Sequence, residues 1–335
     1  MLKLSIILPF YNVEKYIATC LDSIYRQDLP EEQFEIICID DCSPDNSIDI
    51  VQSYINRYSN IKLIRHERNK GLGGGRNTGL KHAKGEYIWF VDTDDTIVEN
   101  KVFGLLKECK ASLDILLFNY QRVDNSLQLI DKAIVFPNSE IKNGVDYVQT
   151  YFKKNFVYHL GYVVRCIYRK DYLIEKEIYF PENELWEDTE FFPKAILLAN
   201  KVQSVDDIVY NYRVNIESIS GAKNRLKADR IFQFAFNAGF NLFSFSQEFK
   251  EVELGIANDL EGKSIWYFNF FVKPLSLANF VEKILFYKLV RENKELIEKI
   301  YPYLNRRSRF IINPILGLIV SIALKPVFIL KEKRK

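Results

Sequence analysis

Short apolar runs alternate with segments of helical spacing over the first third of the chain. Runs that suit buried strands lie at 4–8, 34–39, 61–65, 87–91 and 114–118, and apolar residues at helical spacing lie at 14–26, 44–58 and 99–109. A glycine-rich stretch precedes a further short helix that is expected to end near Ala83. Strands separated by helices of this length imply right-handed crossovers. The pattern predicts an α/β fold with a mostly parallel central sheet flanked by helices.

The remainder of the chain is less regular. Residues 119–184 mix strand-like and helical pieces, 202–212 has the pattern of a strand, and from about Asn224 the sequence becomes helical and rich in aromatic residues. The most apolar segment, FIINPILGLIVSIALKPVFIL at 310–330, lies between NRRSR and KEKRK. We therefore expect a helical C-terminal extension.

Polar residues gather where the predicted strands end, at 9–12, 40–41, 66–69 and 92–95. In open α/β sheets, ligands bind beyond the carboxyl ends of the strands. The clustering therefore predicts a binding site at this edge of the sheet.

Three carboxylates, Asp92, Asp94 and Asp95, follow the strand at 87–91. Two like charges ~4 Å apart repel by about 1 kcal/mol in water and about 4 kcal/mol near a protein surface, so a cation is expected nearby. Mg²⁺ favours one or two carboxylates together with substrate phosphates. Asp92 and Asp94 can face one ligand if the strand continues, because alternate residues share a face. A solvated loop is the alternative, which the buried character of the strand weakens.

The same stretch also resembles the Asp-x-Asp-x-Thr motif of haloacid-dehalogenase-type phosphatases, in which Asp92 would be a nucleophile. That family carries its motif on the first strand of its core. Three strand–helix units precede the motif here, so the phosphatase is the less favoured alternative.

The stretch GLGGGRNTG invites a nucleotide-loop interpretation, but its spacing fits neither a dinucleotide fingerprint nor a P-loop. We expect the start of a helix at which backbone can approach a ligand and Arg76 can contact an anion; a flexible turn is the alternative. Asp40 and Asp41 suit a base or a ribose hydroxyl as hydrogen-bond acceptors. Taken alone, they are more simply a capping pair before the next helix, for which Ser43 is the expected N-cap.

Composition adds exclusions. The net charge is only +2 over 335 residues, which argues against a nucleic-acid binder. Five cysteines without a CxxC pair, namely Cys20, Cys38, Cys42, Cys109 and Cys166, are expected to be reduced thiols. The N-terminal apolar run is too short for a signal peptide and suits a first strand.

The motifs occur in a specific order: PFYN, IDDCSPDNS, N-x-G-x-x-x-x-R-N-x-G, VDTDD and WED. Together they resemble the inverting family 2 glycosyltransferases, which are nucleotide-sugar-dependent enzymes with a GT-A fold. The resemblance covers roughly residues 1–220. It implies a GT-A domain at 1–222, with a nucleotide-binding half at 1–118 and an acceptor-side half at 119–222, and a helical region at 223–335.

The resemblance implies roles for the first strand ends. Pro9, Phe10 and Tyr11 would line the nucleotide pocket. Asp41 would accept a hydrogen bond from the base, with Asp40 beside it. Arg76 would lie near the nucleotide or its phosphates.

It also implies a metal site. Asp92 and Asp94 match the family's D-x-D motif, with Asp92 on the ribose side and Asp94 holding Mn²⁺ or Mg²⁺ on the diphosphate. Arg213 and Ser218, in YNYRVNIESIS at 210–220, would close over the diphosphate. Asn215 stands near the place where some relatives have a metal-reaching histidine, so few protein ligands are implied.

The catalytic base that the resemblance implies is Asp188, with Trp186 and Glu187 shaping the acceptor side. An acceptor hydroxyl must lose a proton as it attacks, and a carboxylate or an imidazole is the suitable base. Attack opposite the leaving group would invert the anomeric centre without a covalent intermediate. A catalytically inactive sugar-nucleotide-binding protein is the alternative, against which Asp188 argues.

The expected donor is a UDP-sugar, because Asp41 suits uracil, with dTDP and GDP donors left open. The expected acceptor is a hydroxyl of a glycan or lipid-linked saccharide in surface polysaccharide or glycoconjugate synthesis. The segment 310–330 and its flanking cations favour a helix on the membrane surface, with a buried helix or an oligomer contact as the alternative. We therefore expect a cytoplasmic protein at the inner face of the cytoplasmic membrane.

Overall fold

The computed structural model describes residues 2–109, 113–133, 136–152, 161, 163–214 and 228–272, and residues 290–309 except 292–293, 295–296, 299–300 and 305–307. The chain divides into two compact units, residues 1–223 and 224–335.

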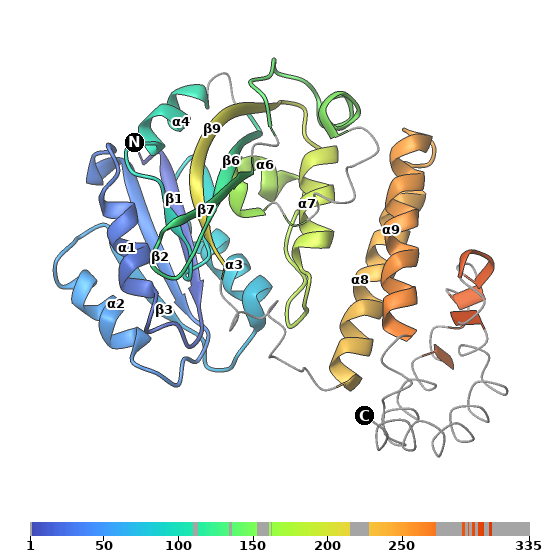
Figure 1. Ribbon diagram of the computed structural model, residues 1–335, viewed down its shortest axis with the longest axis horizontal. Helices are drawn as coiled ribbons and strands as arrows, with labels where there is room; N and C mark the ends of the chain where they lie inside the picture. Colours follow the sequence, from blue (N-terminus) through green and yellow to red (C-terminus); the bar gives the residue numbers. More distant parts are fainter. Residues whose placement is uncertain are drawn as a thin grey trace. The chain divides into compact units, whose positions relative to one another are not determined.

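A twisted β-sheet forms the centre of the first unit (Figure 1). Its described strands are β1 (Leu4–Phe10), β2 (Phe34–Asp40), β3 (Ile61–Arg65), β4 (Tyr87–Phe90), β5 (Thr96–Ile97), β6 (Ile115–Val123), β7 (Leu129–Ala133), β8 (Cys166–Arg169) and β9 (Val202–Arg213). The strand order is β3-β2-β1-β4-β8-β6-β9-β5, and β7 pairs with β6. Strands β1 to β4 pair in parallel, so their carboxyl ends meet at one edge.

The described helices of this unit are α1 (Ile17–Tyr25), α2 (Ser47–Ile55), α3 (Gly71–His82), α4 (Val102–Glu108), α5 (Gly144–Tyr147), α6 (Lys170–Glu175) and α7 (Asp188–Leu197). Short 3-10 turns lie at Glu31–Gln33 and Val163–Arg165, and a π-helical turn at Val148–Phe152. Figure 1 shows α1 and α2 on one side of the sheet and α3 on the other. The predicted α/β class is confirmed.

Alternating side chains of the central strands supply two cores. Leu4, Ile6 and Leu8 of β1 share a buried cluster with apolar residues of α1, α2 and α4. The opposite face packs against α3 and α7, where the ring of Phe90 contacts Phe191 edge-on at 5.8 Å. Both faces of β1, β2 and β4 are covered, which explains their mostly apolar sequences, whereas the edge strand β3 is only partly buried.

Helix α3 lies directly on the sheet because its glycines lack side chains. A Cβ added at Gly79 would lie 2.2 Å from Cγ2 of Ile7, and one at Gly75 would lie 2.7 Å from Cβ of Pro9. The glycine-rich stretch is thus itself the helix, and its first residue, Gly71, has φ +72°. Close packing of the helix on the sheet is a use of these glycines that the sequence interpretation missed.

Several local predictions differ from the structure. Helix α2 begins at Ser47 with Asn46 at the N-cap position, so the prediction of Ser43 as N-cap is wrong. The side chain of Asp45 caps the start of α2 instead, because its Oδ1 accepts hydrogen bonds from the backbone N–H and the hydroxyl of Ser47. The predicted fifth strand is β6, but β8 lies between it and β4.

The second unit contains α8 (Ala228–Phe249) and α9 (Leu254–Val272). The two helices pack closely, with the rings of Phe236 and Phe268 5.8 Å apart and edge-on. None of the helices that the structure describes combines the length and apolar content needed to cross a bilayer. The segment 310–330 lies outside the described residues.

Candidate active site

The acidic stretch after β4 forms a tight turn. Strand β4 ends at Phe90, and the backbone N–H of Asp95 donates to the carbonyl of Asp92 at 3.1 Å. The condition that extended geometry continues through Asp94 is therefore not met. A turn, rather than a strand face, brings the carboxylates together.

Arg76 links this turn to the second acidic cluster. The guanidinium, on α3, donates to Oδ1 of Asp92 at 2.8 Å and to Oε1 of Glu187 at 2.6 Å. Its side chain is only 3% exposed, so these charge-assisted hydrogen bonds lie in a poorly solvated setting. The arrangement joins residues far apart in sequence, 92 and 187, through one cation.

Asp188 begins α7 beside this bridge. Burial and the neighbouring charge of Glu187 raise its pKa from 3.8 to about 7, against the lowering effect of Arg76. Its Oδ2 lies close to Gly161, where an added Cβ would be 2.8 Å away. A carboxyl group with a pKa near neutrality can take up and release a proton at physiological pH.

Asp94 is the carboxylate of the turn that is left available to a ligand. It is half-buried, and burial together with the charge of Asp92 raises its pKa to about 6. Within the described part of the chain, the carboxylate of Asp92 is bound by Arg76 and that of Asp95 by Tyr210 and Arg213, whereas the hydrogen bond to the Asp94 carboxylate comes from its own backbone. An oxygen ligand of this kind beside a second carboxylate fits a hard divalent cation.

The described residues offer few ligands for such a cation. No group of three or more His, Cys, Asp or Glu side chains in the described part of the chain is arranged to hold a metal. Asp92 and Asp94 fit the smaller set that Mg²⁺ or Mn²⁺ uses when substrate phosphates complete its coordination.

Asp95 faces the interior. It is 2% exposed, its Oδ1 accepts the backbone N–H of Arg213 at 2.7 Å, and its Oδ2 accepts the hydroxyl of Tyr210 at 2.7 Å. Burial and the charges of Asp94 and Asp92 raise its pKa, while these two hydrogen bonds oppose the rise. Asp95 is therefore held by β9, and both oxygens of its carboxylate are engaged by that strand.

Arg213, expected over a diphosphate, is buried in this turn region. Its Nε donates to the carbonyl of Asp94 and one terminal nitrogen donates to the carbonyl of Asn125, both at 2.7 Å. The guanidinium lies 5.2 Å from the ring centre of Tyr16. Ser218 and Asn215 lie outside the described residues.

Asp41 sits at the start of α3. Its Oδ1 accepts the backbone N–H of Lys70 and lies 2.7 Å from Nδ1 of His66, and its Oδ2 accepts the N–H of Gly71. A carboxylate has about four acceptor positions, two on each oxygen. The two contacts on Oδ1 and the one on Oδ2 therefore leave one acceptor position on Oδ2. Asp41 thus satisfies the orphan donors of a helix N-terminus, in line with the capping interpretation but for α3 rather than α2.

Asp40 is 1% exposed, and its Oδ1 accepts the N–H of Ser43. Its Oδ2 has no hydrogen bond and lies 3.5 Å from Nε of Arg65. Asp40 therefore holds the loop after β2.

The residues after β1 differ in exposure. Pro9 and Phe10 are buried, and Phe10 belongs to the core shared with α1. Tyr11 is 52% exposed, so its ring is the accessible surface of this segment. Trp186, half-buried, has φ +59° and immediately precedes the Glu187 that Arg76 binds.

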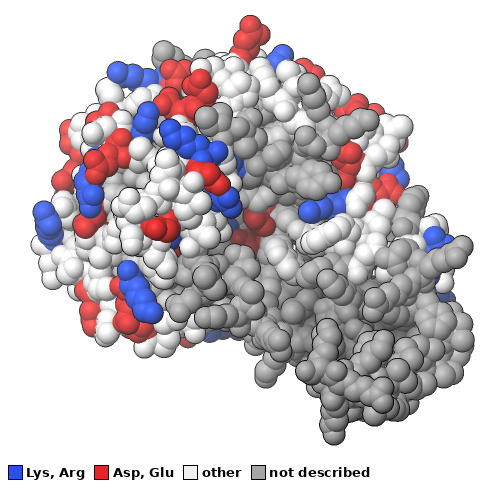
Figure 2. Space-filling model, in the orientation of Figure 1, with Lys and Arg blue, Asp and Glu red and all other residues white. Residues whose placement is uncertain are grey.

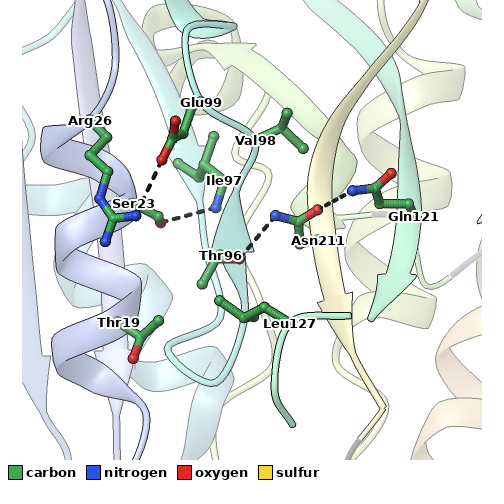
Figure 3. Close-up of a pocket in the computed structure, with 10 residues that line it drawn as sticks. All are labelled: Thr19, Ser23, Arg26, Thr96, Ile97, Val98, Glu99, Gln121, Leu127 and Asn211. Carbon is green, nitrogen blue, oxygen red and sulfur yellow. Dashed lines mark hydrogen bonds and ion pairs between the residues drawn. The ribbon is translucent and has the colours of Figure 1, made fainter. Parts of the chain in front are cut away.

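A cavity of about 340 Å³, drawn in Figure 3, is lined by Thr96, which directly follows the acidic turn, but by none of the three carboxylates of the turn. Its walls come from α1, β5, the loop after β5, β6 and β9, and they include Ser23, Thr96 and Asn211. Asn211 donates to the hydroxyl of Thr96 and accepts from Gln121. The polar side chains of Thr96, Asn211 and Gln121 are therefore hydrogen-bonded to one another.

The surface drawn in Figure 2 shows acidic and basic side chains interspersed over the described residues of that face. This agrees with the small net charge. The five cysteines are free, as expected.

Sequence reasoning missed Tyr210, whose hydroxyl also accepts the backbone N–H of Asp92 at 3.2 Å. It also missed the ion pair between Arg76 and Glu187. The only local signal for Tyr210 was its position three residues before Arg213 in an aromatic strand end.

The sequence matches a known family and is similar to several named proteins. Residues 5–175 match the model of the family described as glycosyl transferase family 2. The chain is 37% identical over 224 residues to the poly(ribitol-phosphate) β-N-acetylglucosaminyltransferase TarS of Staphylococcus aureus strain MW2, covering 65% of this chain and 36% of that protein. It is 35% identical over 218 residues to a poly(ribitol-phosphate) β-glucosyltransferase of Bacillus spizizenii, covering 64% of this chain and 32% of that protein.

Among solved structures, the crystal structure of residues 1–349 of Staphylococcus aureus TarS in complex with UDP-GlcNAc superposes with a TM-score of 0.67 at 24% identity, covering 96% of this chain and 89% of that one. The chain spans about a third of the length of the two full-length relatives. The structural likeness shows a shared fold, and the family match covers just over half of the sequence. The chain therefore belongs to glycosyl transferase family 2 and has the GT-A fold.

Proposed function

We propose that this protein transfers a sugar from a nucleotide-sugar donor, most simply a UDP-sugar, to a hydroxyl group of a glycan or lipid-linked saccharide, with inversion at the anomeric carbon. One observation carries the proposal. Asp188, a carboxyl group with a pKa raised to about 7, lies beside Glu187, which Arg76 connects to Asp92 of the acidic turn. A base and a candidate metal turn are thus held in one charged network.

Asp188 acts as the general base in this proposal. The acceptor hydroxyl attacks the anomeric carbon and gives its proton to the Asp188 carboxylate, while the bond from that carbon to the nucleotide diphosphate breaks on the opposite side. A pKa near the working pH suits this step, since the base is ionised in a useful fraction of molecules and still accepts a proton. Direct displacement of this kind inverts the configuration.

Asp94, with Asp92 beside it, would hold Mn²⁺ or Mg²⁺. When bound, the cation stabilises the negative charge that develops on the departing diphosphate. Arg76 keeps Asp92 oriented by a hydrogen bond to Oδ1. The two acidic clusters then lie on opposite sides of the donor sugar.

The nucleotide is assigned to the carboxyl ends of β1 and β2. Tyr11 offers an exposed ring, and Asp41 keeps one acceptor position after binding Lys70, Gly71 and His66. That position suits the N–H of a uracil ring. The complex of the TarS fragment with UDP-GlcNAc supports a UDP-sugar as the first donor to test.

The acceptor is assigned to cell-surface polymers. Two relatives act on poly(ribitol phosphate) according to their names, and on this basis we propose a surface polysaccharide or glycoconjugate acceptor. The site would work on the cytoplasmic side of the membrane, where the basic ends flanking 310–330 would contact anionic lipid. Co-sedimentation of the full chain with phosphatidylglycerol vesicles, but not with phosphatidylcholine vesicles, checks the membrane assignment; equal recovery in both supernatants contradicts it.

The test of the proposed function uses the purified chain with a panel of UDP-, dTDP- and GDP-sugars and Mn²⁺. Donor turnover and transfer to saccharide acceptors are measured separately. Asp188→Asn should stop transfer and leave donor binding intact. Asp171→Asn, a change on the surface of α6, is the matched control. Transfer by Asp188→Asn at the wild-type rate would remove Asp188 from its role.

Two other functions predict different results. A sugar-nucleotide-binding protein without catalysis would bind UDP in calorimetry and show no turnover with any acceptor. A phosphatase would release phosphate from a generic phosphomonoester and lose that activity in Asp92→Asn. Family membership and the position of the acidic turn on the fourth strand favour the transferase.

A further inference from the structure

The third carboxylate of the acidic turn has no part in the chemistry proposed above. Asp95 is 2% exposed, and both its oxygens are occupied by hydrogen bonds from β9, from the hydroxyl of Tyr210 and the backbone N–H of Arg213. A buried carboxylate that is engaged in this way is a poor candidate for a metal ligand. Its contacts instead hold neighbouring backbone.

Tyr210 connects the two ends of the turn. Its hydroxyl donates to Oδ2 of Asp95 and accepts the backbone N–H of Asp92 at 3.2 Å. A hydroxyl has one donor and two acceptor positions, so both contacts can form at once. The N–H of Asp95 also donates to the carbonyl of Asp92, so the turn is closed both by its own backbone and by the Tyr210 side chain.

Arg213 fixes the middle of the turn. Its Nε donates to the carbonyl of Asp94 at 2.7 Å, while its own backbone N–H is held by Asp95. Asp92, Asp94 and Asp95 thus each have a hydrogen bond to the last four residues of β9. The side chain of Asp94, with the Asp92 carboxylate beside it, is left for a ligand.

The exit of the turn is held from two sides, as Figure 3 shows. Strand β5 begins directly after Asp95, and it pairs with β9 so that Thr96 lies opposite Asn211 and Ile97 opposite Tyr210. The hydroxyl of Ser23 on α1 accepts the N–H of Ile97 at 3.0 Å. This two-residue strand therefore ties the turn to both α1 and β9.

We infer that Asp95 and Tyr210 are positioning residues, which hold the Asp92–Asp95 turn in the shape that presents the Asp94 carboxylate to a divalent cation and the diphosphate it carries. The ligand in this inference rests on the proposed function. The hydrogen-bonded shape of the turn does not, because its contacts are all made within the protein.

The experiment compares Tyr210→Phe with Tyr87→Phe in the full chain. Both substitutions keep a buried ring and remove one hydroxyl on the sheet. Tyr87 donates to the carbonyl of Cys109, at the opposite end of β4 from the acidic turn. Asp95→Asn is the second test variant, since it keeps the size of the side chain and disturbs the same contacts from the other partner.

Three quantities are measured. They are backbone hydrogen exchange of a peptide covering residues 91–98, the dissociation constant of UDP in the presence of Mn²⁺ by calorimetry, and the thermal midpoint. Tyr210→Phe should speed exchange in this peptide and weaken UDP–Mn²⁺ binding about two- to tenfold, because a hydrogen bond of this kind contributes about 0.5–1.5 kcal/mol. Both substitutions should lower the thermal midpoint by similar amounts. Tyr87→Phe should leave exchange in the 91–98 peptide and the dissociation constant of UDP unchanged.

Unchanged exchange and binding in both Tyr210→Phe and Asp95→Asn would overturn the inference, as would equal weakening of binding in Tyr87→Phe. Wild-type protein that binds no UDP with Mn²⁺ would overturn the donor assignment of the proposed function. In that event the exchange comparison would by itself support or overturn the positioning roles.

Discussion

Arg76 and Glu187, which lie 111 positions apart, are joined by a 2.6 Å ion pair in which both side chains are nearly excluded from water. The same guanidinium holds Asp92. Helix α3, the acidic turn and the start of α7 are therefore connected through one side chain, and a change in this side chain acts on both acidic clusters.

Replacing Arg76 should destabilise the protein strongly. Arg76→Met leaves Glu187 buried without its partner, and breaking a buried pair in this way costs about 3–5 kcal/mol of unfolding free energy. Adding Glu187→Gln should recover part of the loss, because it removes the unpaired charge. Denaturant unfolding of the two single variants and the double variant measures this coupling. Losses that simply add would show that the pair does not interact.

The transfer rate should rise with pH and reach half of its maximum near pH 7. Asp188 must be ionised to accept a proton, and its pKa is raised to about 7. A pH profile of single-turnover transfer at saturating donor measures this limb. Asp188→Asn should lower the rate by at least about 100-fold, in keeping with the usual contribution of a general base. A profile that is flat between pH 5 and 8 would exclude this carboxyl group as the base.

The same pKa predicts an effect on stability. Between the usual value of 3.8 and about 7 the folded protein holds a proton on Asp188 that the unfolded chain has lost. The folded state binds more protons in this window, so stability falls as pH rises through it. Asp188→Asn should therefore raise the thermal midpoint at pH 8 and have little effect at pH 4. A variant less stable than the wild type at pH 8 would contradict the assignment.

Metal removal should affect donor binding through Asp94. Asp94→Asn is expected to raise the Mn²⁺ concentration needed for half-maximal UDP binding at least about tenfold, which corresponds to about 1.4 kcal/mol. EDTA should abolish the Mn²⁺-dependent thermal shift in the wild type. Asp131→Asn is the control, because Asp131 lies on β7 in an exposed ion pair with Arg122. Equal Mn²⁺ dependence in the two variants would rule out Asp94 as a ligand.

Two glycines should respond to alanine in opposite directions. Gly79→Ala brings a Cβ within 2.2 Å of Ile7 and should cost about 1–3 kcal/mol through overpacking. Gly104→Ala, in α4, meets no atom within 4 Å and should stabilise the protein by about 0.5–1 kcal/mol through helix propensity. Chemical denaturation measures both. A stabilised Gly79→Ala would mean that α3 can move away from β1.

The sequence predicts the parallel half of the sheet well because three of its four strands, β1, β2 and β4, are mostly apolar runs that are buried along their whole length. The strand predicted at 61–65 coincides with β3, and that at 34–39 differs from β2 by one residue. Strand β5 was not predicted because two residues carry no periodicity; its pairing with β9 and Ser23 defines it. The placement of β8 between β4 and β6 is likewise a long-range choice that no local pattern encodes.

For the candidate site, too, the sequence predicts the features that are local and misses the contacts between residues far apart in the chain. The acidic residues were found because charge after a buried strand is unusual. The bridge through Arg76 was not, since its two partners are separated from it by 16 and 111 positions along the chain. The capping of α3 by Asp41 was missed for a similar reason, because Asp41 directly follows β2 and the helix starts 30 residues later.

The hydrogen bonds of Tyr210 and Arg213 to the acidic turn have a consequence for ligand affinity. Residues Asp92–Asp95 lose their backbone freedom when the chain folds, which costs roughly 1–2 kcal/mol of conformational entropy per residue. That entropy is then not lost again when a cation and a diphosphate bind. A flexible loop with the same three carboxylates would have to be ordered at each binding event, and its affinity would be lower by that amount.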